Sequence, residues 1–397
     1  MRWYTCITKS FAGNSAFFAR DSGLLSRGFR KIGVDSAAIM PGERRPDDEP
    51  DLIRTEYANL EDPAWWRSHR LDGVVLYSWG LPTFTPVAKA IREAGIFLIL
   101  NQDSSGVLFP LVRPWDALRT QFTCYTIESG PITGILKTAL WTAYRLTVGF
   151  ARLEFGRASH LALGDVVSCV SPVAAERYRI YLKHMGKPGL GINVKVIPHP
   201  VADYFGYDPS IPKESRVISI GRWDDHAQKR PHFLAETITL TLRLHPSALF
   251  DIIGNPTPLL QEWYNGLEPG EQARVNLLGK VPNDQLPSYY SRASVLLCPS
   301  SHESFHIPAA EALCTGSTVV APRLASLASF EWFCEDHPES LANDDTPRSL
   351  ADALLCELTA WESGARNPKA ISEKWISRFH STNVCHQILE AFRQSRR

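Results

Sequence analysis

Short apolar runs of strand length alternate with amphipathic runs of helix length along almost the whole chain. The amphipathic run 82–95, for example, lies between two apolar runs. This alternation predicts parallel sheets joined by right-handed helical crossovers, and therefore an α/β fold. The predicted strands are 3–8, 34–40, 73–78, 96–102, 166–171, 216–221, 248–254, 274–279, 294–300 and 317–322. The predicted helices of the second half are 231–244, 283–292, 308–315 and 346–361, followed by two in 371–397.

The segment 194–215 divides the pattern in two. It contains four prolines and no helical period, which is typical of a linker. A chain of 397 residues also favours two domains. We therefore predict two doubly wound, Rossmann-like domains facing each other across a cleft, with boundaries at 1–205 and 206–374. The last helix, about 375–397, is expected to pack back on the first domain.

Composition excludes several classes of protein. Lys and Arg number 42, as do Asp and Glu, so the chain lacks the basic excess of a nucleic-acid-binding protein. The eight cysteines show no CxxC spacing and the twelve histidines no metal-ligand spacing, so no metal site is predicted. The N-terminus has no signal-peptide core, and the apolar runs are too short to span a membrane. These features together predict a cytoplasmic protein with reduced cysteines.

A basic loop follows the strand at 216–221. Gly221 allows a sharp turn, and Arg222, Lys229 and Arg230 precede a helix that Pro231 opens. Cations beside a helix N-terminus can bind a diphosphate, because the helix end adds partial positive charge and N–H donors. The alternative is a solvated basic loop.

Two glutamates follow the strand at 294–300. Glu303 lies in the loop, and Glu311 lies in the early turns of the helix that Pro308 begins. The backbone N–H groups of 305–307 are expected to lie between them. Carboxylates accept strong hydrogen bonds from diols and N–H groups bind phosphate, so the order suits a nucleotide sugar. The alternative is a solvated Glu303 and a Glu311 favoured by the helix dipole.

Four motifs in order carry a family resemblance: "SIGRW…KR", "FDIIGN", "VNLLGKVPND" and "SSHESFHIPAAEALCTGSTVVAP". Together they resemble the donor domain of the retaining GT-B glycosyltransferases of family GT4, over roughly 215–322. The segment "VKVIPHPVADYF" resembles the family's inter-domain segment. The resemblance implies transfer of a sugar, with retention, from a nucleoside diphosphate-sugar to an acceptor hydroxyl. It further implies a UDP- or GDP-sugar as co-substrate, no cofactor, and a role in polysaccharide or glycoconjugate biosynthesis.

The same resemblance implies a role for individual residues. Arg222 and Lys229 would bind the diphosphate, Glu303 the transferred sugar and Glu311 the ribose diol. The loops after Gly254 and Gly279 would frame the base. The remaining donor contacts would come from Ser304, Phe305, His306, Ile307 and the backbone of Val281, beside the turn at Gly221.

Two departures from the family pattern bear on these roles. The segment between Arg222 and Lys229 is longer than usual, so Arg230 is an alternative second cation. His306 stands where the family commonly has glycine, and its side chain would either narrow the phosphate loop or offer another donor.

The first half carries weaker signals. Gly13 and Asn14 lie in the loop after the first strand, where the family often has a glycine-rich loop that binds phosphate or the acceptor. Asp103 follows the strand at 96–102 and could bind a hydroxyl of the acceptor or of the donor sugar. The alternatives are an ordinary loop at Gly13 and an Asx turn at Asp103.

The run 135–157 is amphipathic and contains Lys137, Arg145, Arg152 and Arg157. The favoured interpretation is a helix that packs its apolar stripe on the sheet. The alternative is contact with an anionic membrane, which would place the protein peripherally at the inner membrane face.

Two other functional classes remain open at the level of sequence. One is a nucleotide-sugar epimerase with the same architecture. The other is a protein that binds nucleotide sugars without turnover.

Overall fold

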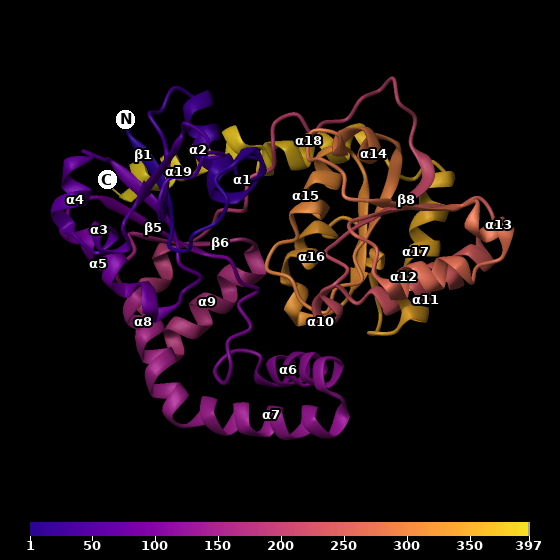
Figure 1. Cartoon of the computed structure of the whole chain (residues 1–397), viewed down its shortest axis with the longest axis horizontal. Coiled ribbons are helices and arrows are strands. Elements are labelled where there is room, and N and C mark those ends of the chain that lie inside the picture. The colour runs from indigo at the N-terminus through magenta and orange to yellow at the C-terminus, as the bar shows by residue number, and fades with distance from the viewer. Residues whose placement is uncertain (396–397) are drawn as a thin grey trace. The chain divides into compact units, whose positions relative to one another are not determined.

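The computed structural model describes residues 1–395, and its chain divides into two compact units (Figure 1). The first unit contains Met1–Val112, Thr142–Asp203 and the C-terminal residues from Arg378 onward. The second contains Arg113–Trp141 and Tyr204–Ser377. The segment 113–141 thus groups with the second unit, whereas the sequence placed it in the first domain.

The first unit is built on a seven-stranded parallel sheet with the order β3-β2-β1-β4-β5-β6-β7. The winding reverses between β1 and β4, which lie side by side. Every residue of β4 is buried, as expected for a central strand covered on both faces. The strands are β1 (Trp3–Ile7), β2 (Ala38–Pro41), β3 (Leu52–Thr55), β4 (Gly73–Tyr77), β5 (Phe97–Gln102), β6 (Val166–Cys169) and β7 (Val194–Val196).

Helices flank this sheet, and the C-terminal helix α19 is part of the same unit. Helix α19 packs on α2, and Phe392 meets Trp3 edge to face at 5.3 Å. Residues 396 and 397 of the predicted last helix lie outside the described residues. The helices are α1 (Ser15–Phe18), α2 (Asp21–Lys31), α3 (Tyr57–Leu60), α4 (Pro63–Ser68), η1 (Pro82–Phe84), α5 (Thr85–Glu93), η2 (Phe150–Phe155), α8 (Gly156–Leu161), α9 (Pro172–His184), η3 (Pro188–Asn193) and α19 (Ser381–Ser395).

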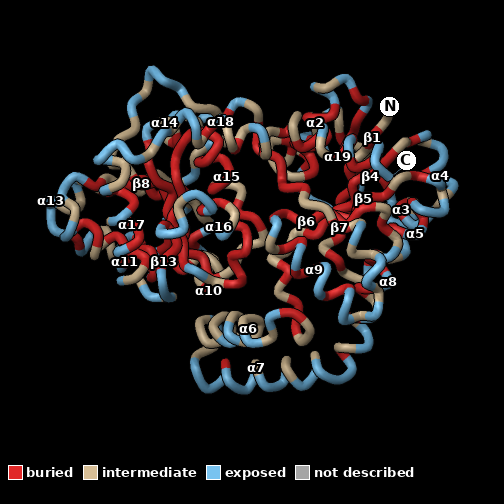
Figure 2. The backbone as a smooth tube through the Cα atoms, turned by 180° about the vertical axis from the view of Figure 1, so that it is seen from behind, coloured by how far each residue is buried: buried red, intermediate tan, exposed pale blue. Residues whose placement is uncertain are grey.

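The second unit repeats the design with a six-stranded parallel sheet, ordered β10-β9-β8-β11-β12-β13. Its winding reverses between β8 and β11. The strands of both sheets are among the most buried parts of the chain (Figure 2). The strands are β8 (Glu214–Ile220), β9 (Leu249–Ile253), β10 (Val275–Gly279), β11 (Ala293–Leu297), β12 (Thr318–Pro322) and β13 (Leu341–Ala342).

In the second unit α11 packs on α17, and α17 in turn packs on β8, β11 and β12. The helices of this unit are α6 (Pro114–Ser129), α10 (His226–Lys229), α11 (Pro231–Leu244), α12 (Pro258–Asn265), α13 (Pro269–Gln272), α14 (Leu286–Arg292), α15 (Ile307–Cys314), η4 (Ala325–Leu327), α16 (Ala328–Phe333), η5 (Pro338–Ser340) and α17 (Pro347–Glu362). Helices α7 (Pro131–Leu146) and α18 (Pro368–Phe379) each run from one unit into the other.

The prediction of parallel α/β sheets is confirmed, and each predicted strand overlaps an observed one. Three strands were missed: β3, β7 and β13. Strand β7 lies inside 194–215, so the interpretation of that whole segment as a linker is wrong at its start. All three lie at a sheet edge and have no more than four residues, so each carries too short an apolar run to stand out.

The amphipathic run 135–157 differs from the favoured prediction. It is not one helix, because α7 ends at Leu146 and a π-helical turn, η2, leads into α8. The prediction that its apolar stripe packs on the sheet is wrong for α7, whose one buried residue is Gly134.

Candidate functional site

The candidate site of the second unit lies where β8 and β11 end. These neighbouring strands flank the reversal of winding, and in open parallel sheets ligands bind beyond the carboxyl ends of strands at such a point. Gly221 directly follows β8, and the loop with Glu303 follows β11. The topology therefore brings together residues that lie far apart in the sequence.

Glycine backbones form one wall of this site. The Gly254 N–H donates to the Gly279 carbonyl at 2.8 Å, and the Gly221 N–H donates to the Ile253 carbonyl at 3.1 Å. A Cβ on Gly254 would stand 2.0 Å from the Gly221 oxygen, and φ at Gly254 is +121°. A larger residue at Gly254 would therefore clash with this backbone. Val281 lies half-buried in the loop that follows.

Lys229 and Glu303 form an ion pair within this site. Both side chains are largely buried, and Gln228 Nε2 donates to Glu303 Oε2 at 3.2 Å and to the His302 carbonyl at 3.1 Å. Burial alone would raise the pKa of Glu303, but the nearby His306 and Lys229 outweigh it and hold this pKa below its usual range. Glu303 is therefore a fixed, ionised acceptor at neutral pH.

Arg222 lies at the rim of the same site. Its side chain is exposed, with Nη2 at 3.3 Å from Gln228 Oε1 and 3.6 Å from Asp225 Oδ2. Gln228 thus contacts both Arg222 and Glu303. The long segment between Arg222 and Lys229 supplies this glutamine, which was not singled out as a site residue.

Arg230 is buried and has a different set of partners. Its Nε donates to the Pro299 carbonyl at 2.6 Å, and Nη2 donates to the Ser300 carbonyl at 3.2 Å. Its Nη1 lies 2.7 Å from Asp345 Oδ1. Since these contacts tie Arg230 to the loop after β11, it supports that loop, and Lys229 is the better placed of the two cations for a ligand.

His306 caps helix α15 in an unusual backbone conformation. Its φ of +70° and ψ of +77° lie in the left-handed region, which gives a reason for glycine being common at this position in the resembled family. Its Nδ1 accepts from the Ala309 N–H at 3.1 Å, so the buried imidazole serves as the N-cap. The side chain thus turns back onto the helix.

The neighbours of His306 are held by packing. Ser329 Oγ donates to the Ser304 carbonyl at 2.8 Å, and the Phe305 ring meets Phe333 at 5.3 Å. Ile307 is the first residue of α15, whose N-terminal N–H groups lack acceptors within the helix. These contacts therefore hold the loop in place directly before the N-terminus of α15.

Glu311 is buried inside the second unit, one turn into α15. Tyr290, on α14, donates its hydroxyl to Glu311 Oε2 at 2.8 Å. No local spacing links Tyr290 to Glu311, so this partner could not be predicted from the sequence pattern. A buried carboxylate held by a neutral donor keeps acceptor capacity for a ligand diol.

In the first unit Asp103 belongs to a cluster with two residues that were not predicted, and of these three residues only His199 is buried. His199 Nε2 is 3.0 Å from Asp103 Oδ1, and His199 Nδ1 is 3.2 Å from Asp21 Oδ1. Burial lowers the pKa of His199, but Asp103 and Asp21 outweigh it and raise this pKa to about 9. The imidazole is therefore a buried cation between two carboxylates at neutral pH.

A buried ion pair between Arg54 and Asp48 holds the loop after β1. Arg54 Nη2 lies 2.8 Å from Asp48 Oδ1 and donates to the Phe11 carbonyl at 2.7 Å. A Cβ on Gly13 would stand 2.1 Å from Leu52 Cδ2 and 2.4 Å from Asp48 Oδ1. Gly13 is therefore required for close packing.

Asn14 has a local structural role in the same loop. Its Oδ1 accepts from the Ala16 N–H at 3.2 Å, which caps α1.

Comparison with known proteins relates part of the second unit to a known family. Residues 214–359 match the family model described as glycosyl transferases group 1. We call residues 214–359 the group 1 domain after this match, which covers less than half of the chain. A curated relative, D-inositol 3-phosphate glycosyltransferase from Corynebacterium urealyticum, is 28% identical over 191 residues. These residues are 46% of this chain and 44% of the relative, so the chain aligns with less than half of that relative's length.

Solved structures give the fold of the whole chain. The lipopolysaccharide outer core galactosyltransferase WaaB, in its apo form, matches with a TM-score of 0.62 and 14% identity, over 99% of each chain. HepE from Anabaena, in complex with UDP, matches with a TM-score of 0.61 and 14% identity, over 99% of this chain and 100% of that one. The prediction of a GT-B fold is confirmed.

Among residues 1–395, one group of side chains could offer three ligands to a metal ion, and it lies in the group 1 domain. Cys298, Glu303 and His306 offer ligand atoms within 4.8 Å of one another. Burial raises the pKa of the Cys298 thiol to about 11, and Lys229 already pairs with Glu303. A protonated thiol and a neighbouring ammonium both disfavour a divalent cation.

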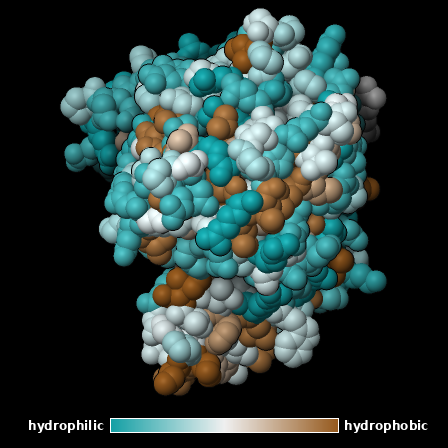
Figure 3. All heavy atoms as spheres, turned by 90° about the vertical axis from the view of Figure 1, so that its right-hand side faces the viewer, coloured by the Kyte–Doolittle hydropathy of each residue, from teal (hydrophilic) through white to brown (hydrophobic). Residues whose placement is uncertain are grey.

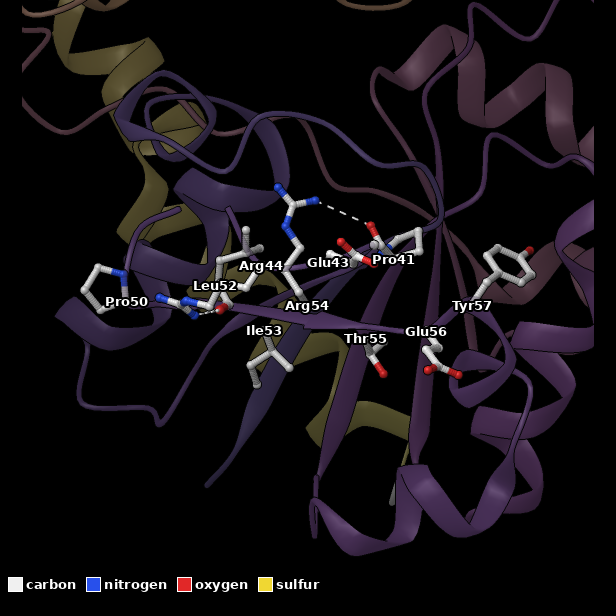
Figure 4. A pocket seen from close by; sticks show the side chains of 11 residues that line it. Pro41, Glu43, Arg44, Pro50, Leu52, Ile53, Arg54, Thr55, Glu56 and Tyr57 are labelled. Carbon is white, nitrogen blue, oxygen red and sulfur yellow. Dashed lines mark hydrogen bonds between the residues drawn. The ribbon is translucent and has the colours of Figure 1, made fainter. Parts of the chain in front are cut away.

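A surface hollow of about 860 Å³ lies outside the group 1 domain, beside edge strand β3 (Figure 4). Arg54 Nη1 donates to the Pro41 carbonyl at 3.4 Å, and Arg44 Nη1 donates to the Leu52 carbonyl at 3.1 Å. No predicted site residue lines this hollow, so it is separate from the candidate site. Its lining is Pro41, Gly42, Glu43, Arg44, Pro50, Leu52, Ile53, Arg54, Thr55, Glu56 and Tyr57.

Proposed function

We propose that this protein is a glycosyltransferase that moves a sugar from a nucleoside diphosphate-sugar to an acceptor hydroxyl, with retention at the anomeric carbon. One observation carries the proposal: in a group 1 domain, Lys229 and Glu303 pair at the ends of β8 and β11, with Glu311 buried in the following helix. The pair offers an ammonium for phosphate and a carboxylate for hydroxyls in one place.

In the proposed complex each group meets the part of the donor that its chemistry suits. Lys229 and Arg222 neutralise the diphosphate, aided by the N-terminal N–H groups of α15. Glu303 accepts hydrogen bonds from the sugar hydroxyls, and Glu311 accepts them from the ribose diol. The base lies by the loops after Gly254 and Gly279, with Val281 as a backbone contact.

The proposed reaction is a single exchange of bonds at the anomeric carbon. The bond from this carbon to the diphosphate oxygen breaks, and a bond to the acceptor oxygen forms on the same face of the sugar. The acceptor proton passes to an oxygen of the leaving diphosphate. Glu303 orients the sugar and does not attack it, while the cations stabilise the charge that develops on the leaving group.

The acceptor side of the proposal rests on the first unit. Asp103 is proposed to accept a hydrogen bond from an acceptor hydroxyl, and the cationic His199 beside it orients the Asp103 side chain. The loop with Gly13 and Asn14 is proposed to contact the acceptor or its phosphate, held in place by the Asp48–Arg54 pair.

The comparisons support a nucleotide-sugar donor and leave its identity to experiment. HepE was solved with UDP, and one curated relative is named as a glycosyltransferase of D-inositol 3-phosphate. We propose a UDP- or GDP-sugar as the donor and a role in polysaccharide or glycoconjugate biosynthesis.

A thermal-shift panel with UDP-, GDP- and ADP-sugars tests donor binding, because a ligand of the folded state raises its apparent stability. The proposal predicts a higher melting temperature with one UDP- or GDP-sugar, and release of the nucleoside diphosphate when an acceptor is added. Conversion of the donor alone into an isomer would instead identify an epimerase. Stabilisation without turnover on any acceptor would indicate a binding protein.

A further inference from the structure

Helix α7 presents large apolar side chains to solvent. Five of the exposed ones lie between Ile132 and Tyr144, including Ile132 at 84% and Leu140 at 63%. Hydrophobic residues gather at the lower end of the view in Figure 3, the level at which Figure 1 places α6 and α7. We call this set the α7 stripe: Ile132, Ile135, Leu136, Leu140 and Tyr144.

The spacing of the stripe places it along one side of the helix. Residues 132, 136, 140 and 144 are four apart, so their side chains line up along the axis. Gly134 lies on the opposite side, against α6, where a Cβ would stand 2.6 Å from Thr126 Oγ1. Leu146, the last residue of the helix, and Val148 and Phe155 beyond it extend the exposed apolar surface.

The charge of this segment has one sign. From Pro131 to Leu153 the sequence contains Lys137, Arg145 and Arg152 but no Asp or Glu. Arg145 is held inside by Glu154 at 2.6 Å. Lys137 and Arg152 are exposed, and neither forms an ion pair among residues 1–395. Two cations therefore accompany the apolar stripe at the surface.

The dimensions of α7 suit a helix that lies along a bilayer. Its 16 residues measure about 24 Å, short of the roughly 20 residues that a membrane span needs. Within the described part of the chain, no helix combines the length and apolar character required to cross a bilayer. An exposed apolar stripe beside cations on a short helix is the pattern of an interfacial helix.

We propose that α7 binds the surface of an anionic lipid bilayer. The α7 stripe inserts among the upper acyl chains, and Lys137 and Arg152 lie beside the lipid phosphates. A second copy of the chain fits the segment less well, because twofold pairing of α7 with itself would oppose cations to cations. This surface is independent of the proposed glycosyl transfer.

Vesicle co-sedimentation of the full chain tests the proposal. The wild type should pellet with vesicles of phosphatidylcholine and phosphatidylglycerol, and much less with phosphatidylcholine alone. High salt should weaken the binding without abolishing it, because the apolar contribution does not depend on salt.

Paired substitutions separate the apolar contribution from the electrostatic one. The double variant Leu136→Ser/Leu140→Ser should lower the partition coefficient at least about tenfold. The matched control Ile192→Ser/Leu244→Ser changes two exposed apolar residues elsewhere and should leave it unchanged. The variant Lys137→Gln/Arg152→Gln should bind both vesicle types about equally.

Each of the following results would overturn the proposal. The wild type does not pellet with anionic vesicles, or Leu136→Ser/Leu140→Ser binds as well as its control. Alternatively, light scattering shows a wild-type dimer that the same double variant dissociates, which would identify a second copy as the occupant. Circular dichroism verifies folding, since both replaced leucines are exposed.

Discussion

Two polar clusters differ in how the sequence encodes them. Lys229 and Glu303 come from segments that each carry a local motif, and both follow neighbouring strands of the second sheet. Asp21, Asp103 and His199 come from three separated segments of the first unit, and of these three only Asp103 was predicted from the sequence as a site residue. Each cluster contains a largely buried charged group, Glu303 in one and His199 in the other, and burying a charge is costly unless function or pairing compensates it. The contrast shows that residues can form a polar cluster in the fold although local motifs do not link them to one another.

The largest expected effect is on turnover. Glu303→Gln keeps the shape of the side chain but removes the charge that pairs with Lys229. If Glu303 orients the sugar in the transition state, turnover should fall on the order of 10²- to 10³-fold, while the donor dissociation constant changes little. The rate of nucleoside diphosphate release measures turnover.

Glu373→Gln provides the control, because this exposed glutamate lies on α18 and outside the candidate site. Turnover of Glu303→Gln within threefold of the wild type would remove Glu303 from the mechanism.

The next effect is on stability, and it distinguishes Arg230 from the ligand-binding cations. Arg230→Met leaves Asp345 without its buried partner and two carbonyls without donors, so the free energy of unfolding should fall by about 3 kcal/mol. Arg222→Met changes an exposed side chain and should cost less than about 0.5 kcal/mol. Urea denaturation measures both. Equal stability of the two variants would show that Arg230 does not support the loop.

The charge of His199 in the first unit should make the free energy of unfolding depend on pH. The folded-state pKa of His199 is raised to about 9, so its stabilisation is complete below its ordinary value near 6.5 and is lost as pH rises through 9. Relative to His199→Gln, the wild type should therefore lose on the order of 2 kcal/mol of stability between pH 6 and pH 10. If the difference in unfolding free energy between the wild type and His199→Gln is the same at pH 6 and pH 10, the imidazole is not charged in the folded protein.

The smallest effect concerns the ribose contact. Glu311→Gln keeps an acceptor for the Tyr290 hydroxyl but binds a diol less strongly, so donor affinity should fall about tenfold. Calorimetric titration of the donor measures this change, with Tyr290→Phe as the companion variant. An unchanged affinity in Glu311→Gln would place the ribose elsewhere.

The sequence predicted the parts of the fold that depend on local pattern. The long buried strands and the helix at 231–244, observed as α11 (Pro231–Leu244), follow from periodicity and from prolines at helix starts. The edge strands β3, β7 and β13 were missed because pairing partners, not their own short runs, define them.

Packing explains the failure at α7. Helices α7 and α19 are both amphipathic, yet α19 packs on α2 while α7 exposes its stripe. A helical period shows that a stripe exists but does not specify what covers it.

The residues of the candidate site were likewise predicted only in part. Glu303, Lys229 and Arg222 were predicted from their order after strand ends, and the structure brings these three together around Gln228. The roles of Gln228 and Tyr290 depend on tertiary contacts with no fixed spacing, so no local signal revealed them. The conformation of His306 also became clear only from its backbone, where φ is +70°.

The most direct test of glycosyl transfer is the anomeric configuration of a product. The protein, the donor selected by thermal shift and a panel of hydroxyl acceptors are incubated together, and proton NMR follows the anomeric signal. The account predicts a new glycoside with the anomeric configuration of the donor, formed in step with nucleoside diphosphate. A product of inverted configuration, or an isomerised donor with no glycoside, would contradict it.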